Sequence, residues 1–513
     1  MKALRVAICL CAALQAAGGC TVTQDVKTYE QLCRASDKTL RLLAVDRSVY
    51  ELRIHAMNDS TIEGSGIHVV NGDRIPFTGQ LAYRDLVYIQ MQSGSFWQTT
   101  VALGFASLAT FSLLSAKEDQ GLRVYAPSSG GTSSCPYVYA WSGEGYALQG
   151  EAFGTSFGKG LEAETISMLP EARARGEEIV VRVANERPET HYVNRAALLA
   201  FEAPVGAEVL VDTENRAWPV VRSEAAAAGP AEVKRKDGSY WIRSAGDTGP
   251  ATSYRDFLEV GFARPVGARD ASLIVRAINT DFGYSVFQLV FGYLGDQTLP
   301  FLYQVENDPE LIRVLQGWLE EASLVVEIEE QGRWTSAGAI APEASACLFS
   351  RIVRLDASGL EGDSLRVRLG SLADGWRIDA VEIDWTEVAP LEAHPLAMRS
   401  ARDGSGTSMM EALEEMDTRY VVVLPGEGIE MTFEAYRASG QGVVAYALEA
   451  GGYLLEWPAA AEADANSWFP TLPGGFGKGP ERLAVVNALL HDRDMLLPLV
   501  YDFWRQRRQK IAG

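Results

Sequence analysis

The sequence has few residues of the kinds that build metal centres. Its 513 residues include only 5 histidines and 6 cysteines. No histidine pair has the H-x-H or H-E-x-x-H spacing of a zinc site, and no C-x-x-C or G-x-x-x-x-G-K-[ST] motif occurs. Cys33, Cys135 and Cys347 lie far apart, which leaves open either one disulfide or three buried thiols. Zinc enzymes and P-loop proteins are not indicated, and we expect no cofactor.

The chain is also short of positive charge. It has 46 lysines and arginines against 67 acidic residues, a formal net charge of -21 and a pI of about 4.8. A nucleic-acid partner is excluded because phosphate binding needs a concentrated basic face. Hydrophobic residues make up 47% and charged residues 22%, which is typical of a globular protein. The length suits about three domains.

Residues 1–19 are predicted to be a lipoprotein signal peptide. A basic start at Lys2 and Arg5 is followed by an apolar core and by small residues up to Cys20, in "MKALRVAICLCAALQAAGGC". The end of this segment resembles the lipobox of bacterial lipoproteins, with Ala17 where that family usually has leucine. The resemblance implies that Cys20 is lipidated and anchors the protein to a membrane.

Residues 20–95 are predicted to form a small β domain. In "YELRIHAM" the apolar residues Tyr50, Leu52, Ile54 and Ala56 alternate with polar ones, which is the pattern of a half-buried strand. The turn signals "NDS" and "NGD" separate this run from its neighbours. About five short strands in some seventy residues suit a small barrel of the SH3-like or Sm-like type.

The longest uncharged run extends from Phe96 to Ala116, "FWQTTVALGFASLATFSLLSA". A helix of about 20 residues matches the thickness of a bilayer core, and Phe96 and Trp97 suit an interfacial anchor. The alternative is a core helix wrapped by β domains. We expect one hydrophobic helix that is associated with the membrane. The sequence does not decide whether this helix spans the bilayer. Residues 117–134 read as a linker.

The remainder is predicted to be mainly β, with a β-rich domain over 135–300 and a β-sandwich domain over 324–460. Between them, 301–323 reads as a helical insertion. Its segment "NDPELIRVLQGWLEEA" has Asn307 as a candidate N-cap and Pro309 in the first turn. Residues 461–513 read as a C-terminal helical tail.

Several elements together resemble an uncharacterised bacterial envelope lipoprotein family. They are "CPYVYAWSGEGYALQGEAFG", "ANERPETHYVN", "AINTDFG" and "GYLLEW", and the resemblance extends from about Cys20 to Trp457. It implies a lipoprotein-like start, a small N-terminal β domain, a hydrophobic segment and a Cys-Pro-Tyr-Val-Tyr β-sandwich region. The family carries no known catalytic residues.

Two acidic groups are weighed as sites. Glu382 and Asp384 lie two apart on a predicted strand, as glycosidase acids do, although a polar outer surface explains them more simply. The loop "DASGLEGD" offers oxygen ligands for calcium, and a plain turn is the competing interpretation. The calcium candidates are Asp356, Ser358, Glu361 and Asp363.

Two further features have structural and functional interpretations. Three aromatic residues, Trp141, Tyr146 and Tyr453, are either a sugar-stacking platform or core of a sandwich. The basic tail "WRQRRQK" is either the end of a helix or a contact for anionic lipid or a partner. "GGFGKG" lacks P-loop spacing and is predicted to be a plain loop.

We therefore expect a non-enzymatic, membrane-anchored lipoprotein of the bacterial cell envelope. Its β domains, on the periplasmic side, would bind a partner protein or a glycan, and the membrane contacts would be Cys20 and Phe96 to Ala116. One alternative is a carbohydrate-active β-sandwich enzyme that uses Glu382, Asp384 or loop carboxylates. The other is a membrane-spanning sensor or assembly factor.

Overall fold

The computed structural model describes most of the chain, in sixteen segments. They are 39–44, 49–57, 61–70, 73–82, 86–91, 136–187, 189–242, 254–294, 297–343, 346–360, 362–404, 406–424, 426–438, 440, 442–456 and 480–512. The described chain falls into two compact units, one containing β1–β5 and the other β6–β25. Strands dominate both units, so the mainly β prediction is confirmed.

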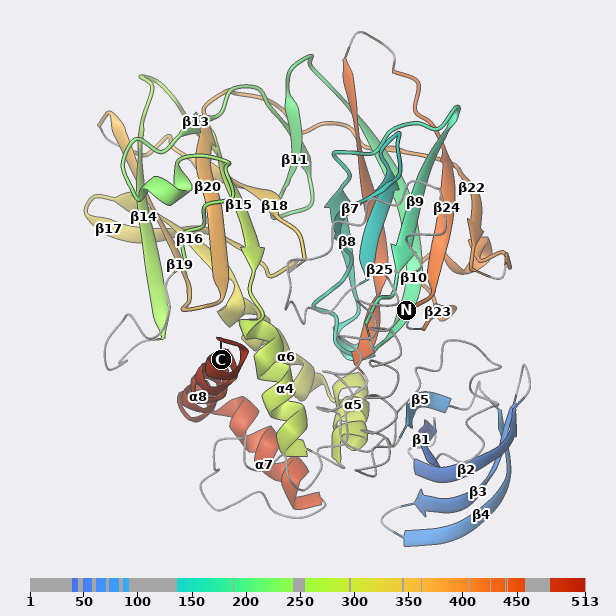
Figure 1. Ribbon diagram of the computed structural model, residues 1–513. Coiled ribbons are helices and arrows are strands. Elements are labelled where there is room, and N and C mark those ends of the chain that lie inside the picture. Colours follow the sequence, from blue (N-terminus) through green and yellow to red (C-terminus); the bar gives the residue numbers. More distant parts are fainter. Residues whose placement is uncertain are drawn as a thin grey trace, which may run out of the picture. The chain divides into compact units, whose positions relative to one another are not determined.

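The N-terminal unit is built on one antiparallel sheet in the order β4-β3-β2-β1-β5 (Figure 1). Its strands are β1 (Thr39–Ala44), β2 (Val49–Met57), β3 (Thr61–Val70), β4 (Asp73–Ala82) and β5 (Leu86–Met91). Leu42, Leu52, Ile54 and Ile62 are its most buried side chains. Among the described residues β4 and β5 do not pair, so closure into a barrel stays a prediction.

The predicted alternation in β2 holds only as far as Ile54. Leu52 and Ile54 are buried, but Ala56 is exposed because the register with β3 shifts between Ile54 and Ala56. A β-bulge adds one residue to a strand and turns the following side chains to the other face. The predicted alternation is therefore correct for Tyr50, Leu52 and Ile54 and wrong for Ala56, because the bulge leaves no clear mark in the sequence.

The first β-sandwich combines strands from two distant parts of the chain. One sheet has the order β22-β24-β9-β6-β7, and the other has β21-β10-β25-β8 with β23 also on β10. Side chains such as Val138, Val181, Leu198 and Phe433 fill the core between them. The strands are β6 (Tyr137–Trp141), β7 (Tyr146–Glu151), β8 (Ala163–Met168), β9 (Glu178–Ala184), β10 (Glu189–Ala203), β21 (His394–Pro395), β22 (Met398–Arg402), β23 (Val421–Val423), β24 (Gly428–Glu434) and β25 (Val443–Glu456).

The second β-sandwich is inserted between β10 and β21 of the first. Its sheets have the orders β12-β11-β18-β15-β20-β13 and β14-β19-β16-β17, and they share one core (Figure 1). The strands are β11 (Glu208–Asp212), β12 (Ala217–Val220), β13 (Glu224–Ala225), β14 (Arg255–Ala263), β15 (Asp270–Asn279), β16 (Leu324–Glu330), β17 (Arg333–Ile340), β18 (Phe349–Asp356), β19 (Ser364–Leu372) and β20 (Trp376–Asp384).

This nesting differs from the predicted division of the chain. The ranges 135–300 and 324–460 each supply strands to both sandwiches. Ala200 of β10 pairs with His394 of β21, so the chain leaves and re-enters the first sandwich at neighbouring strands. A linear reading of strand patterns cannot detect an insertion of this kind, because each strand has the same local signature in either sandwich.

In the part of the chain that the structure describes, the α-helices come from two separate stretches. They are α4 (Phe282–Leu294), α5 (Thr298–Asn307), α6 (Pro309–Ala322), α7 (Pro480–His491) and α8 (Arg493–Ala512), with 3-10 turns η2 (Lys159–Leu161), η3 (Ala231–Val233) and η5 (Met410–Ala412). The predicted helical insertion 301–323 is present and begins earlier, at α4. The indole of Trp376 donates to the Ala322 carbonyl and the Tyr501 hydroxyl donates to that of Ala373, which joins α6 and α8 to the second sandwich.

The N-cap of α6 is Asp308 and not Asn307. The Asp308 side chain accepts hydrogen bonds from the backbone N–H groups of Glu310 and Leu311, and Pro309 stands in the first turn as predicted. Asn307 instead ends α5 and donates to the Tyr303 carbonyl. Helices α5 and α6 are separated by a single residue, so an error of one position in the sequence prediction assigns the cap to the wrong helix.

No helix within the described segments combines the length and apolarity needed to cross a bilayer. The run from Phe96 to Ala116 lies outside those segments, as do Cys20, Cys33 and Cys135. The predictions about them stay predictions.

Candidate ligand-binding site

An apolar cavity of about 160 Å³ lies in the larger unit, where residues of the helices and of both sandwiches line it. Helix α4 contributes Phe287 and Phe291, which are four residues apart and therefore on one face. The segment after β7 contributes Phe157, whose ring centroid is 3.9 Å from that of Phe287. Trp318 of α6 lines one side of the cavity. Its indole N–H donates to the Leu490 carbonyl at 2.9 Å, which holds the ring in place.

The approach of the β7 segment to the helices depends on glycine. A Cβ on Gly160 would lie 1.9 Å from the Val305 carbonyl oxygen of α5. Any side chain there would therefore push η2 away from the helix. Leu161, next in the chain, lines the cavity.

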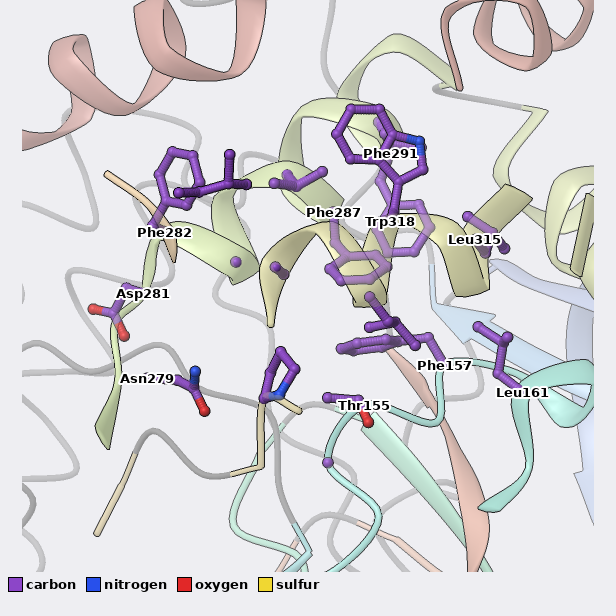
Figure 2. A pocket seen from close by; sticks show the side chains of 18 of the residues that line it. Thr155, Phe157, Leu161, Asn279, Asp281, Phe282, Phe287, Phe291, Leu315 and Trp318 are labelled. Carbon is purple, nitrogen blue, oxygen red and sulfur yellow. The ribbon is translucent and has the colours of Figure 1, made fainter. Parts of the chain in front are cut away.

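The lining has a polar end and an apolar end. Figure 2 shows Asn279 and Asp281 on one side and the side chains of Phe291, Leu315 and Trp318 on the other. The Asn279 side-chain oxygen accepts from the backbone N–H of Glu343 at 2.9 Å, which holds the loop after β17 at the polar end. Thr155 is a further polar lining residue and lies beside Phe157, so a ligand in this cavity would meet most of its polar groups, but not all of them, at the Asn279 end.

A wider crevice of about 850 Å³ lies between the two sandwiches. Residues of β7, β8 and β25 line it from the first sandwich, and residues of β11, β15 and β18 line it from the second. Glu151 and Glu343 line both this crevice and the apolar cavity. The two hollows therefore adjoin at these two acidic residues.

The Glu343 carboxylate and the Arg351 guanidinium form an ion pair in this wall. Arg351 also donates to the Ile166 carbonyl at 2.8 Å, and so it joins β18 to β8 of the other sandwich. Burial raises the pKa of Glu343, and the Arg351 charge offsets only part of that effect. About a quarter (24%) of the Glu343 side chain is still accessible to solvent.

Glu151 is more deeply placed, with 7% of its surface exposed. Its carboxylate accepts from the backbone N–H of Ala346 at 2.6 Å, which ties down the loop that carries Glu343. Burial, with the charges of Glu151 and Glu343, raises the pKa of the Cys347 thiol. Cys347 is a free thiol that stays protonated at neutral pH.

The formal charges of the side chains that line the crevice sum to zero. Its lining residues include three arginines and three glutamates, namely Arg173, Arg276, Arg351, Glu151, Glu208 and Glu343. The whole chain carries a net charge of -21, so this hollow is less negative than the protein that surrounds it. Ligands without net charge fit such a wall better than strongly anionic or cationic ones.

The acids predicted from the sequence lie elsewhere and have structural partners. Asp384 is 2% exposed and accepts from the backbone N–H groups of Val221, Arg222 and Thr386, at 2.7 to 2.9 Å. Glu382 forms an ion pair with Lys236 at 2.9 Å. Neither residue lines the cavity or the crevice. The predicted polar outer surface is therefore wrong for Asp384, which is a buried carboxylate that organises a turn.

The calcium loop is described except at Glu361. Asp356 accepts from the backbone N–H of Ser358 at 2.9 Å, as in an Asx turn. No group of three or more potential metal-ligating side chains occurs within the described segments. The calcium proposal stays a prediction.

The three predicted platform aromatics do not form one surface. Trp141 and Tyr146 meet edge to face across the β6–β7 hairpin, and Tyr146 donates to Glu430 at 2.6 Å. Tyr453 is on the other sheet, where it is only 7% exposed and stacks on Tyr192 at 4.6 Å.

Of the remaining sequence features, "GGFGKG" lies outside the described segments, and the basic tail belongs to α8. Arg505 of that tail pairs with Asp502 at 2.8 Å. Helix α8 is the C-terminal helix that was predicted.

Sequence reasoning missed the residues that line the two hollows. Phe287 and Phe291 have helical spacing in "SVFQLVFGYLG", but core packing predicts the same spacing.

Sequence reasoning also passed over Gly154-Thr155-Ser156-Phe157-Gly158, which has the G-x-S-x-G spacing of a hydrolase nucleophile. The Ser156 side chain is buried and outside both hollows, and the α-helix that should follow such a turn is replaced by η2.

Comparison with known proteins gives no family. No protein-family model matches the chain, and no curated protein matches it. Among solved structures, one match is a β-porphyranase of glycoside hydrolase family 86 from the human gut bacterium Bacteroides plebeius. It has 10% identity and a TM-score of 0.16, over 42% of this chain and 35% of that one. The chain thus spans about a third of that enzyme's length.

A second match is a structure of Sulfolobus Turreted Icosahedral Virus, with 8% identity and a TM-score of 0.13, over 64% of this chain and 91% of that one.

Proposed function

We propose that this protein is a non-enzymatic, membrane-anchored lipoprotein of the bacterial cell envelope that binds a glycan in the crevice between its two sandwiches. The crevice carries the proposal: it is wide, its formal charges cancel, and hydrogen-bonding side chains line it on both walls. Uncharged sugars are bound by such mixed donor and acceptor walls. The predicted lipid anchor at Cys20 supports the location.

Glycan binding is tested with the full-length protein in amphipol on an array of envelope and extracellular polysaccharide fragments. The best fragment is then titrated by calorimetry. Ala174→Trp puts a large side chain on an exposed position of the crevice and should abolish binding. Ala263→Trp, exposed at the end of β14 and outside the crevice, is the matched control. Binding that survives Ala174→Trp would remove the crevice from the proposal.

The anchor is tested separately. Cells grown with labelled palmitate should incorporate label into the wild-type protein and not into Cys20→Ala.

Cysteines introduced at Ser60 and Ser142, in a chain without Cys33, Cys135 and Cys347, then report on the run from Phe96 to Ala116. Labelling of both by an impermeant maleimide in intact spheroplasts supports a body outside the inner membrane. Labelling at Ser60 alone favours the membrane-spanning sensor.

A second candidate function, glycan hydrolysis, is favoured by Glu343. A glycosidase needs two carboxyl groups, one of which keeps its proton. The raised pKa of Glu343 suits the acid, and Glu151 lines the same hollow. New reducing ends from a bound glycan, lost in Glu343→Gln and retained in Glu382→Gln, would establish the enzyme and end the non-enzymatic proposal.

A further inference from the structure

We propose that the ligand is a glycolipid, with its sugar in the crevice and the start of its alkyl chain in the apolar cavity. This inference rests on the proposed glycan binding and adds the class of glycan. The shared wall carries it, because Glu151 and Glu343 line both hollows. One molecule with a polar and an apolar part can occupy both.

The chemistry of the cavity selects an apolar occupant. Phe157, Phe287 and Phe291 line it together with Leu315 and Trp318, whereas Asn279 and Asp281 lie at its other end. The indole N–H of Trp318 is already bound to a backbone carbonyl, so the ring presents only apolar surface to the cavity. A sugar placed there would lose hydrogen bonds to water without replacing them.

The size of the cavity sets the length of chain that fits. An apolar cavity of roughly 150 Å³ accommodates benzene, a group of six carbons. The present cavity, at about 160 Å³, therefore has room for about six carbons of an alkyl chain. The crevice is about five times larger and takes the bulkier head.

The sugar head group and the alkyl chain of the glycolipid would join at the polar end of the cavity. The backbone of Glu343 is fixed by Asn279, and Arg351 is held by both Glu343 and the Ile166 carbonyl. Glu151 fixes the same loop through Ala346. These bonds hold the wall in place before a ligand arrives, so little order has to be created on binding.

The test uses methyl, butyl, hexyl and decyl β-glucosides, below their micelle concentrations, with the full-length protein in amphipol and an empty-amphipol blank. Affinity should rise about fourfold for each methylene that enters the cavity. The gain should stop near hexyl, because the cavity is then full. Calorimetry or ligand-observed NMR measures the series.

Two variants locate the chain. Val286→Trp on α4 and Leu319→Trp on α6 each enlarge a half-buried lining residue, so either one alone is sufficient if the other fails to fold. Each should remove the chain-length gain and leave the methyl glucoside unaffected. Gln288→Trp, on α4 and outside the cavity lining, is the control.

The outcomes separate this inference from the function on which it rests. Affinity that does not depend on chain length, or no binding by any of the four glucosides, overturns the glycolipid, and the glycan array still decides the crevice. A chain-length gain that Val286→Trp and Leu319→Trp leave intact overturns it as well. A chain-length gain that survives Ala174→Trp shows that binding does not need an open crevice, and it overturns glycan binding there.

Discussion

Asp212 is the residue on which the β11–β12 hairpin depends. Its carboxylate is buried and accepts four hydrogen bonds: from the backbone N–H groups of Glu214 and Arg216, the Arg216 guanidinium and the Trp218 indole. Burial alone would raise the pKa of Asp212, but these hydrogen bonds together lower it below its ordinary value of 3.8. The ionised form is therefore the one that the fold prefers.

The sign of the pH dependence follows from this lowered pKa. The stabilisation is complete above the unfolded pKa of 3.8 and is lost as the pH falls through the lower folded value. Asp212→Asn should lower the free energy of unfolding by about 2 to 3 kcal/mol at pH 7, because it removes charged hydrogen bonds. The difference should shrink at pH 3, since Asp212 is then mostly protonated in the unfolded chain and folding to the ionised form must release that proton.

Urea denaturation at both pH values measures this difference. Asp237→Asn is the control, because Asp237 is an exposed carboxylate that holds the backbone N–H of Ser239. An equal loss for Asp212→Asn at pH 7 and pH 3 would mean that shape, and not charge, makes Asp212 necessary.

At the scale of single elements, α6 is the helix that joins the cavity to the second sandwich. Its buried face carries Leu311 and Leu315, Trp318 lines the cavity, and its last turn meets Trp376. The start of the helix is fixed by Asp308. Because a capping side chain satisfies backbone N–H groups that have no partner within the helix, its loss is felt along the first turn.

Asp308→Ala should therefore destabilise the protein by about 1 kcal/mol, while Asn307→Ala should have a smaller effect. The reason is that Asp308 accepts two backbone hydrogen bonds of α6, whereas Asn307 donates only one, to α5. Thermal unfolding of the two variants, compared side by side, checks the assignment. A larger loss for Asn307→Ala would restore Asn307 as the cap.

For the whole molecule, the pairing of β10 with β25 dominates the first sandwich. The two strands are paired from Glu189 opposite Glu456 to Ala203 opposite Val443, although the second sandwich separates them in sequence. Such a pairing has a high cost in loop closure, which compact folding of the inserted sandwich reduces. We expect the amides of both strands to exchange with solvent as one cooperative unit.

Gly452→Val tests that unit. A Cβ at Gly452 would lie 2.2 Å from the Tyr192 carbonyl oxygen, so the two strands must separate there. Hydrogen exchange should speed up in both β10 and β25 and change less in β15, β18 and β20. Gly404→Val, with open space around the added side chain, is the control. Faster exchange confined to β25 would show that the strands open independently.

The strand-rich character, the helices near residue 310 and at the C-terminus, and the acidic composition can all be predicted from the sequence alone. These follow from local periodicity, capping residues and composition, which need no knowledge of distant contacts. The nesting of the second sandwich in the first, the burial of Asp384 and the meeting of Glu151 and Glu343 in one wall depend on contacts between distant parts of the chain. Glu151 and Glu343 are almost two hundred residues apart in sequence, so no local pattern connects them, and the packing of the sandwiches alone makes them neighbours.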